Sequence, residues 1–98
     1  MDNGQTDKNA INIKKHGISF VEAAEVFNDP NAIEFYDIDH STAEEDRYQV
    51  LGDIGNCLIV LVVYTDRNGF ARIISARPAE PKEEAVYYEH IKKAFGRN

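Results

Sequence analysis

Apolar residues recur at two different spacings along the chain, and the change of spacing separates helical from extended parts. The early part has helical spacing. It predicts a first helix over about Asp7 to His16, with cations at its negative end, before Gly17. A second helix is expected from Ser19, because Ser19 and Glu22 match the S-x-x-E capping box. Its predicted apolar stripe is Phe20, Ala23, Ala24 and Phe27, ahead of a stop at Asn28-Asp29-Pro30.

After Pro30 the apolar spacing changes to two, which is typical of strands. Strands are predicted over Ala32 to Tyr36, Arg47 to Gly52, Cys57 to Thr65 and Phe70 to Arg77. The third of these is apolar at successive positions, which favours a central strand covered on both faces, with Cys57 buried in it. Asn68-Gly69 indicates a tight hairpin, and the polar stretch from Asp37 to Glu45 indicates a loop.

A last helix is expected from Pro81 to about Phe95, because proline fits the first helical position and acidic residues follow it. The 98 residues of the chain then form a single α+β domain, residues 1–98. It contains two N-terminal helices, a mainly antiparallel four-stranded sheet and one C-terminal helix. We expect the helices on one face of the sheet, as two layers.

Charge is unevenly distributed along the chain. The net charge is −6, with four basic and twelve acidic residues in 1–56 but seven basic and five acidic residues in 57–98. An acidic chain argues against general binding of duplex DNA, while the second half leaves room for a local cationic site. The longest apolar run, Cys57 to Tyr64, is far shorter than the roughly 20 residues of a membrane-spanning helix. Neither a secretory signal nor a second cysteine is present, so a cytoplasmic location is expected.

Several strings in the chain resemble the BrnT toxins of bacterial type II toxin–antitoxin systems. The resemblance covers roughly residues 8 to 90 and is strongest in K-H-G-x-S-F-x-x-A and R-I-I-S-A-R. The matching segments are Lys14–Phe20, Glu22–Pro30, Val62–Thr65 and Arg72–Arg77, with isolated matches at Asp37, His40, Ser41, Glu45, Arg47, Arg67, Ala79, Glu83, Tyr87 and Tyr88.

The resemblance implies a RelE-like ribonuclease fold and an RNA-cleaving activity that inhibits translation. It also implies a protein partner, an antitoxin with a ribbon-helix-helix region, which neutralises the toxin. The complex would bind operator DNA only through the antitoxin. No zinc-like spacing and no glycine-rich phosphate loop occurs in the sequence, so neither a metal nor a cofactor is predicted.

Metal-free cleavage of RNA needs a base, an acid and cations around the phosphate. His40, in the acidic loop, is the candidate acid or base, and Glu45 is its orienting partner or the alternative base. Arg67 and Arg77 are the candidate phosphate-binding catalytic residues. Arg72 has the opposite parity to Arg77, so both can line one site only if a bulge intervenes or if one acts from beyond the strand end.

Further residues are candidates for RNA contact: Lys14, Lys15, Tyr64 and Arg72. Each candidate also has a structural interpretation. The histidine can be an ordinary loop residue, the arginines can pair with acids, the tyrosine can pack in the core, and the lysines can serve the helix dipole. Two other functions therefore stay open. The chain could be a weakly active or inactive antitoxin-binding module, which the acidic residue Glu80 favours, or a DNA-binding regulator, which the net charge disfavours.

Overall fold

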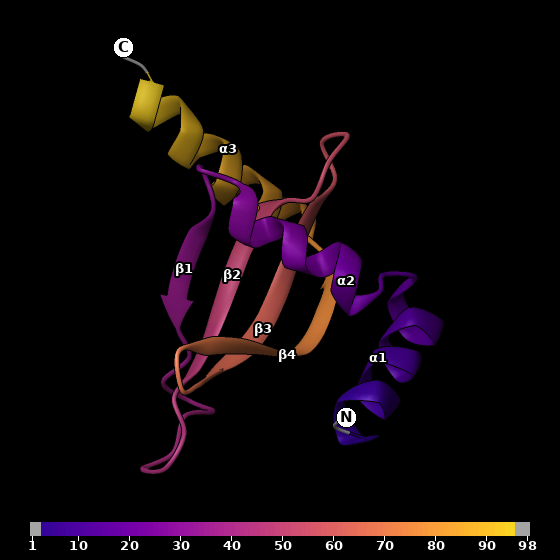
Figure 1. Cartoon of the computed structure of the whole chain (residues 1–98). Coiled ribbons are helices and arrows are strands. Elements are labelled where there is room, and N and C mark those ends of the chain that lie inside the picture. The colour runs from indigo at the N-terminus through magenta and orange to yellow at the C-terminus, as the bar shows by residue number, and fades with distance from the viewer. Residues whose placement is uncertain (1–2, 96–98) are drawn as a thin grey trace.

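The computed structural model describes residues 3–95 and contains a four-stranded antiparallel sheet with helices around it (Figure 1). The elements in chain order are α1 (Asn3–His16), α2 (Phe20–Ala23), the 3₁₀ helix η1 (Ala24–Asn28), β1 (Ile33–Tyr36), β2 (Arg47–Asp53), β3 (Ile59–Arg67), β4 (Phe70–Pro78) and α3 (Pro81–Phe95). The strands lie in sequence order, and each neighbouring pair is antiparallel. The predicted α+β class and the antiparallel sheet are confirmed.

Short sequence signals correctly predicted the start of α2 and the turn between β3 and β4. The capping box is formed, since the amide of Glu22 donates to Ser19 Oγ (3.0 Å) and the amide of Ser19 donates to Glu22 Oε1 (2.8 Å). The α1 helix ends at His16 as predicted but begins at Asn3, four residues before the expected start. Asn68 and Gly69 both have positive φ (56° and 86°), which is the backbone of the predicted tight hairpin between β3 and β4.

The segment after Ser19 buries a different stripe from the predicted one. Its helix becomes a 3₁₀ helix at Ala24, and a 3₁₀ helix has three residues per turn. Positions three apart then face the sheet, so Phe20, Ala23 and Val26 are buried. The predicted stripe positions Ala24 and Phe27 are exposed, and that part of the prediction is wrong because it assumed a period of 3.6 throughout.

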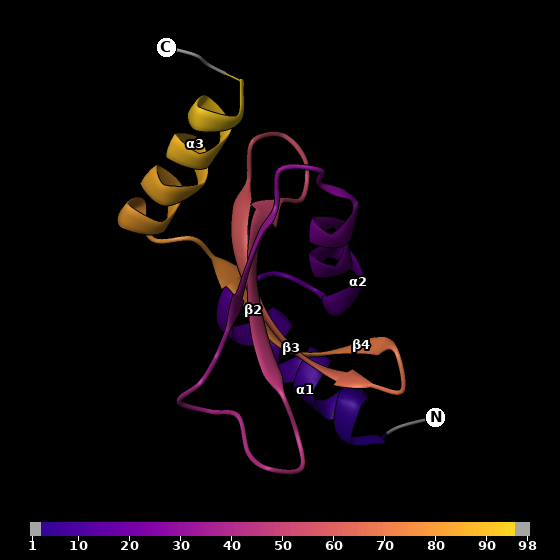
Figure 2. The same ribbon diagram turned by 90° about the vertical axis from the view of Figure 1, so that its left-hand side faces the viewer.

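Helices lie on both faces of the sheet, so the two-layer prediction is wrong (Figure 2). The α2–η1 segment covers one face, where Phe20 and Val26 pack with Val60 and Val62 of β3. The α3 helix covers part of the opposite face, where its residue Tyr87 packs with the side chains Leu51, Ile59 and Leu61. Both sides of β3 are therefore buried, as its uninterrupted apolar sequence predicted.

Cys57 is exposed and lies outside the sheet, contrary to the prediction of a buried strand residue. Asn56 and Cys57 both have positive φ (55° and 61°), and the amide of Leu58 donates to Gly55 O (3.0 Å). This is a tight turn between β2 and β3, and it delays the start of β3 to Ile59.

Asp29, directly after η1, links the helices on the two faces at one end of the sheet. Its Oδ2 accepts the hydroxyl of Tyr87 (2.6 Å) and the amide of Asp53 (2.9 Å), while its Oδ1 accepts the amide of Asn31 (2.8 Å). Burial raises the pKa of the Asp29 carboxyl, but these three hydrogen bonds outweigh it and hold that pKa below its ordinary value. Through Asp29, the α3 helix is thus attached to the segment before β1 and to the end of β2.

Candidate functional site

The loop between β1 and β2 is held in shape by its own hydroxyl groups. Ser41 Oγ donates to Asp37 O (2.7 Å) and accepts the amide of Arg47 (2.8 Å), which joins the two ends of the loop. The amide of Thr42 donates to Glu45 O (2.8 Å), and the amide of Glu45 donates to Thr42 Oγ1 (3.1 Å). The positions of His40 and Glu45 therefore follow from a hydrogen-bonded loop rather than from an open polar stretch.

His40 lies against Asp37 within this loop. Its Nδ1 is 3.0 Å from each carboxylate oxygen of Asp37, and Gln49 Nε2 donates to Asp37 Oδ2 (3.2 Å). The hydrogen bond with His40 holds the pKa of Asp37 below its ordinary value, against burial of the carboxyl and with help from Gln49. Nδ1 is thus held by Asp37, and Nε2 is the ring nitrogen left to face a substrate.

Glu45 lies between two arginines. Its Oε2 is 3.5 Å from Arg67 Nη2, and its Oε1 is 3.8 Å from Arg47 Nη2. The structure therefore brings two of the sequence-derived candidates, Glu45 and Arg67, into contact, and adds Arg47. His40 comes from the same loop but is oriented by Asp37, whereas the sequence suggested Glu45 for that task.

One row of residues crosses the sheet beside this loop. The register pairs Arg47 of β2 with Thr65 of β3, and Thr65 with Arg72 of β4, so the three side chains share one face. Thr65 is 1% exposed, and neither its Oγ1 nor the buried Arg47 Nε has a hydrogen-bond partner among the described residues. Buried polar atoms are nearly always bonded, so these two atoms on paired strands are unsatisfied groups in the interior next to the loop.

A bulge in β4 supplies the condition under which Arg72 and Arg77 can share a face. Val63 pairs with Ser75 and Tyr64 pairs with Ile73, so Ile74 is the extra residue. Arg72 is then opposite Thr65 and Arg77 is opposite Leu61, both on the face that α3 covers. Leu61 and Thr65 are four positions apart on β3, which corresponds to about 13 Å along the strand.

Arg77 is not brought to Glu45 and Arg67. Its two terminal nitrogens donate to the two carboxylate oxygens of Glu83, each at 2.8 Å, at the start of α3. This bidentate pair raises the pKa of Arg77 through the hydrogen bonds to Glu83 and lowers that of Glu83.

Tyr64 lies on the other face of the sheet, in an aromatic and acidic setting. Its ring stacks on Tyr48 with centroids 5.4 Å apart and meets the edge of Phe27 at 5.2 Å. Glu34 and Asp66 line the same shallow hollow of about 390 Å³. Burial, and after it these carboxylates and Asp46, raise the pKa of Tyr48. A stacking role for Tyr64 toward RNA would have to overcome that negative charge.

Lys14 and Lys15 are exposed in the last turn of α1, which packs on β4.

Sequence reasoning identified Glu45, Arg67 and Arg72 as site candidates. It did not identify Arg47 and Thr65, or the contacts of Glu45 with Arg47 and Arg67. Only the pairing of β2 with β3 shows that Arg47 and Thr65 are neighbours, and no local pattern predicts that pairing.

No group of three or more histidine, cysteine or acidic residues within residues 3–95 could hold a metal ion. None of the helices in this described part is long and apolar enough to cross a membrane.

The chain was compared with models of known protein families. The model of a family described as the ribonuclease toxin, BrnT, of type II toxin–antitoxin systems matches residues 5–83. That range contains more than half of the chain, all four strands and every site residue described above. A search of curated proteins found no matching sequence.

Proposed function

The chain belongs to the BrnT family of ribonuclease toxins of type II toxin–antitoxin systems, and from this premise we propose that it cleaves RNA without a metal ion. The cleavage inhibits translation, and an antitoxin protein with a ribbon-helix-helix region neutralises it. The observation that carries the proposal is the contact of Glu45 with Arg67 and Arg47, in the loop that also holds the His40–Asp37 pair. This loop and the strand ends beside it supply a carboxylate, an imidazole and two guanidinium groups.

Two side chains of the loop can move the protons of the reaction. Glu45 takes the proton from the ribose 2′-OH, whose oxygen then attacks the phosphorus. His40, oriented by Asp37 through Nδ1, gives a proton from Nε2 to the departing 5′-oxygen. The products are a 2′,3′-cyclic phosphate and a free 5′-hydroxyl, so the protons balance. Acid–base assistance of this kind contributes about 10²- to 10⁴-fold each.

The cations stabilise the charge that builds on phosphorus. Arg67 is half exposed and 3.5 Å from Glu45, so it can turn from the carboxylate to a phosphate oxygen. Arg47, which also lies beside Glu45, can bind a phosphate oxygen through its terminal nitrogens. Arg72, in the same row, contacts the next phosphate.

The remaining sequence-derived candidates stay predictions. A catalytic role for Arg77 requires its guanidinium to leave Glu83, with which it makes two hydrogen bonds. RNA contacts of Lys14 and Lys15 require only that the bound RNA extend to the end of α1. A contact of Tyr64 requires RNA to approach the acidic face of the sheet.

A second function is favoured by one specific observation. Arg47, Arg67 and Arg77 each lie within 4 Å of a carboxylate, which reduces the positive potential available to RNA. The chain would then be a weakly active or inactive module that binds the antitoxin within a repressor complex.

The test is RNA cleavage by the purified chain in the presence of a metal chelator. We expect cleavage with cyclic-phosphate ends and a loss of at least 100-fold in His40→Ala and in Arg67→Ala. His90→Ala, an exposed histidine on α3, is the matched control and should keep full activity. In a cell-free translation reaction the same two variants should no longer inhibit. An absence of cleavage at high protein concentration, alongside tight antitoxin binding, would instead support the binding module.

A further inference from the structure

The β1 strand is an unprotected sheet edge. It has β2 on one side and no strand on the other within the described residues (Figure 1). Its sequence, Ile33–Tyr36, has no lysine or proline, the residues that usually guard such an edge. Phe35 is 41% exposed, and Ile38, just beyond the strand, is 75% exposed. An apolar edge of this kind invites another extended segment.

The backbone groups that face outward from β1 can be identified. The amide of Asp37 donates to Arg47 O (2.8 Å), so Asp37 points its backbone toward β2. Backbone direction alternates along an antiparallel strand, so Ile33 and Phe35 also point inward. The amide and carbonyl groups of Glu34 and Tyr36 therefore face the open edge.

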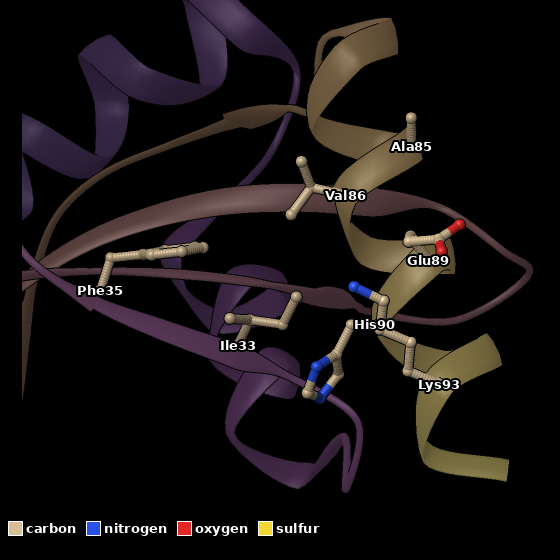
Figure 3. Close-up of a pocket in the computed structure, with 7 residues that line it drawn as sticks. All are labelled: Ile33, Phe35, Ala85, Val86, Glu89, His90 and Lys93. Carbon is tan, nitrogen blue, oxygen red and sulfur yellow. The ribbon is translucent and has the colours of Figure 1, made fainter.

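A hollow lies between the same edge and α3, and we name it the β1–α3 groove (Figure 3). Its volume is about 570 Å³, and it is lined by Ile33, Phe35, Ala85, Val86, Glu89, His90 and Lys93. The view shows side chains of β1 and of α3 turned toward one another across the hollow. Val86 is 49% exposed on a helix whose other side is buried through Tyr87.

The groove continues toward the candidate RNA site. A second hollow of about 330 Å³ shares Phe35 and Val86 with it and has Leu51, Leu61 and Gln49 in its wall. Gln49 bonds the Asp37 carboxylate that holds His40. An occupant of the groove would therefore end close to the catalytic loop.

We propose that an extended segment of the antitoxin adds to β1 as a fifth strand and fills the β1–α3 groove with its alternate side chains. The inference rests on the proposed function for the identity of the partner. The segment would bond the outward groups of Glu34 and Tyr36 and carry apolar residues at every second position, opposite Phe35 and Val86. Because the groove leads to Gln49, the bound segment also blocks access to His40.

A protein of a different sequence fits this edge better than a second copy of the chain. Two copies would each carry a net charge of −6 and would repel one another. The family description, in contrast, supplies a protein partner in the antitoxin. The occupant is therefore a separate chain whose apolar positions alternate.

The first experiment compares two valine variants in calorimetric titrations with the full-length antitoxin. Val86→Glu puts a charge into the groove, whereas Val21→Glu makes the same change at an 81% exposed site on α2. We expect at least tenfold weaker binding for Val86→Glu and unchanged binding for Val21→Glu. Equal affinities would overturn the proposal. Thermal unfolding of both variants checks that each is folded.

The second experiment measures amide hydrogen exchange, which reads the backbone directly. In the complex the amides of Glu34 and Tyr36 should become protected at least tenfold, while those of Ile33 and Phe35 are already protected by β2. No change at Glu34 and Tyr36 would contradict strand addition, and protection without antitoxin would indicate a second copy instead. If the free chain fails to cleave RNA but these results are obtained, the proposal that the antitoxin binds at β1 is supported and only the nuclease proposal fails.

Discussion

The side chain of Asn12 pairs with the backbone of Ala76 as a neighbouring strand would. Its Nδ2 donates to Ala76 O (2.8 Å), and its Oδ1 accepts the amide of Ala76 (3.0 Å). The same Nδ2 donates to Ile18 O (2.9 Å). One buried carboxamide therefore closes the outer edge of β4 and attaches α1 to it, while the opposite edge, β1, has no such cover among the described residues.

We expect Asn12→Leu to destabilise the fold by about 2 to 4 kcal/mol, because it leaves both backbone groups of Ala76 buried without partners. Urea unfolding measures the loss. Asn28→Leu is the control, since Asn28 is exposed and bonds only to Glu25, and it should change the free energy of unfolding by less than about 0.5 kcal/mol. Equal effects of the two variants would show that the Asn12 contacts contribute nothing.

Tyr87→Phe should cost about 1 to 3 kcal/mol, since it removes the hydroxyl that donates to Asp29. The pKa of Asp29 is lowered in the fold, so its contribution is present above the unfolded pKa of about 3.9 and is lost as pH falls through the folded value. Burial, and then Asp29, raise the pKa of Tyr87, so its contribution is present below about pH 10 and is lost above it.

The stability difference between wild type and Tyr87→Phe should therefore be largest from about pH 5 to 9 and should narrow at both extremes. Unfolding curves across that range provide the measurement. A difference that does not change with pH would mean that the Asp29 carboxylate is not the partner that matters. Tyr88→Phe, an exposed neighbour on α3, serves as the control.

Gly52→Ala should destabilise the chain by about 1 to 3 kcal/mol, because the site is closed on three sides. A Cβ there would come within 3.3 Å of Val26 Cβ, Ala32 Cβ and Asp29 Oδ2. Gly17 is a poor control because its φ is positive, so the comparison is with Ser41→Ala in the loop, which removes hydrogen bonds but adds no volume. Chemical unfolding measures the stability loss of both variants. Crowding at Gly52 should also weaken the Tyr87 contact, because Asp29 Oδ2 accepts the Tyr87 hydroxyl, whereas the loss at Ser41 should stay within the loop.

Variants of Arg77 and Glu83 test whether Arg77 has a structural or a catalytic role. The pair is only partly buried, so Arg77→Ala and Glu83→Gln should each cost no more than about 1 kcal/mol. If Arg77 takes part in cleavage, Arg77→Ala lowers the rate and Glu83→Gln does not. Equal rates for the two variants in the RNA assay would confine Arg77 to holding α3. Because the pKa of Glu83 is lowered, the stability that the pair contributes is lost as pH falls below about 4.

Features that depend on neighbouring residues were predictable from the sequence. The capping box of Ser19 and Glu22 and the hairpin at Asn68-Gly69 are set by side chains a few positions apart. The antiparallel order of four strands followed from short connections. The resemblance to BrnT toxins is confirmed by the family match over residues 5–83.

Features that depend on distant pairing were not predictable. The apolar sequence of α3 does not say which face of the sheet it covers, and the Asp29–Tyr87 bond that fixes it joins residues 58 positions apart. The same holds for the candidate site. His40, Glu45 and Arg67 are recognisable by residue type, but Thr65 becomes a partner of Arg47 only through the β2–β3 register.

The extra residue at Ile74 divides β4 into two parts. Before it, even-numbered residues such as Arg72 face α3, and after it, odd-numbered residues such as Arg77 do. A regular strand of the same length would place Arg72 and Arg77, five positions apart, on opposite faces, whereas removal of Ile74 would leave Tyr64–Ile73 and Val63–Ser75 as consecutive pairs and keep both arginines on one face. The bulge is therefore as necessary as the arginines themselves for a strand of this length to present both Arg72 and Arg77 on the α3 face.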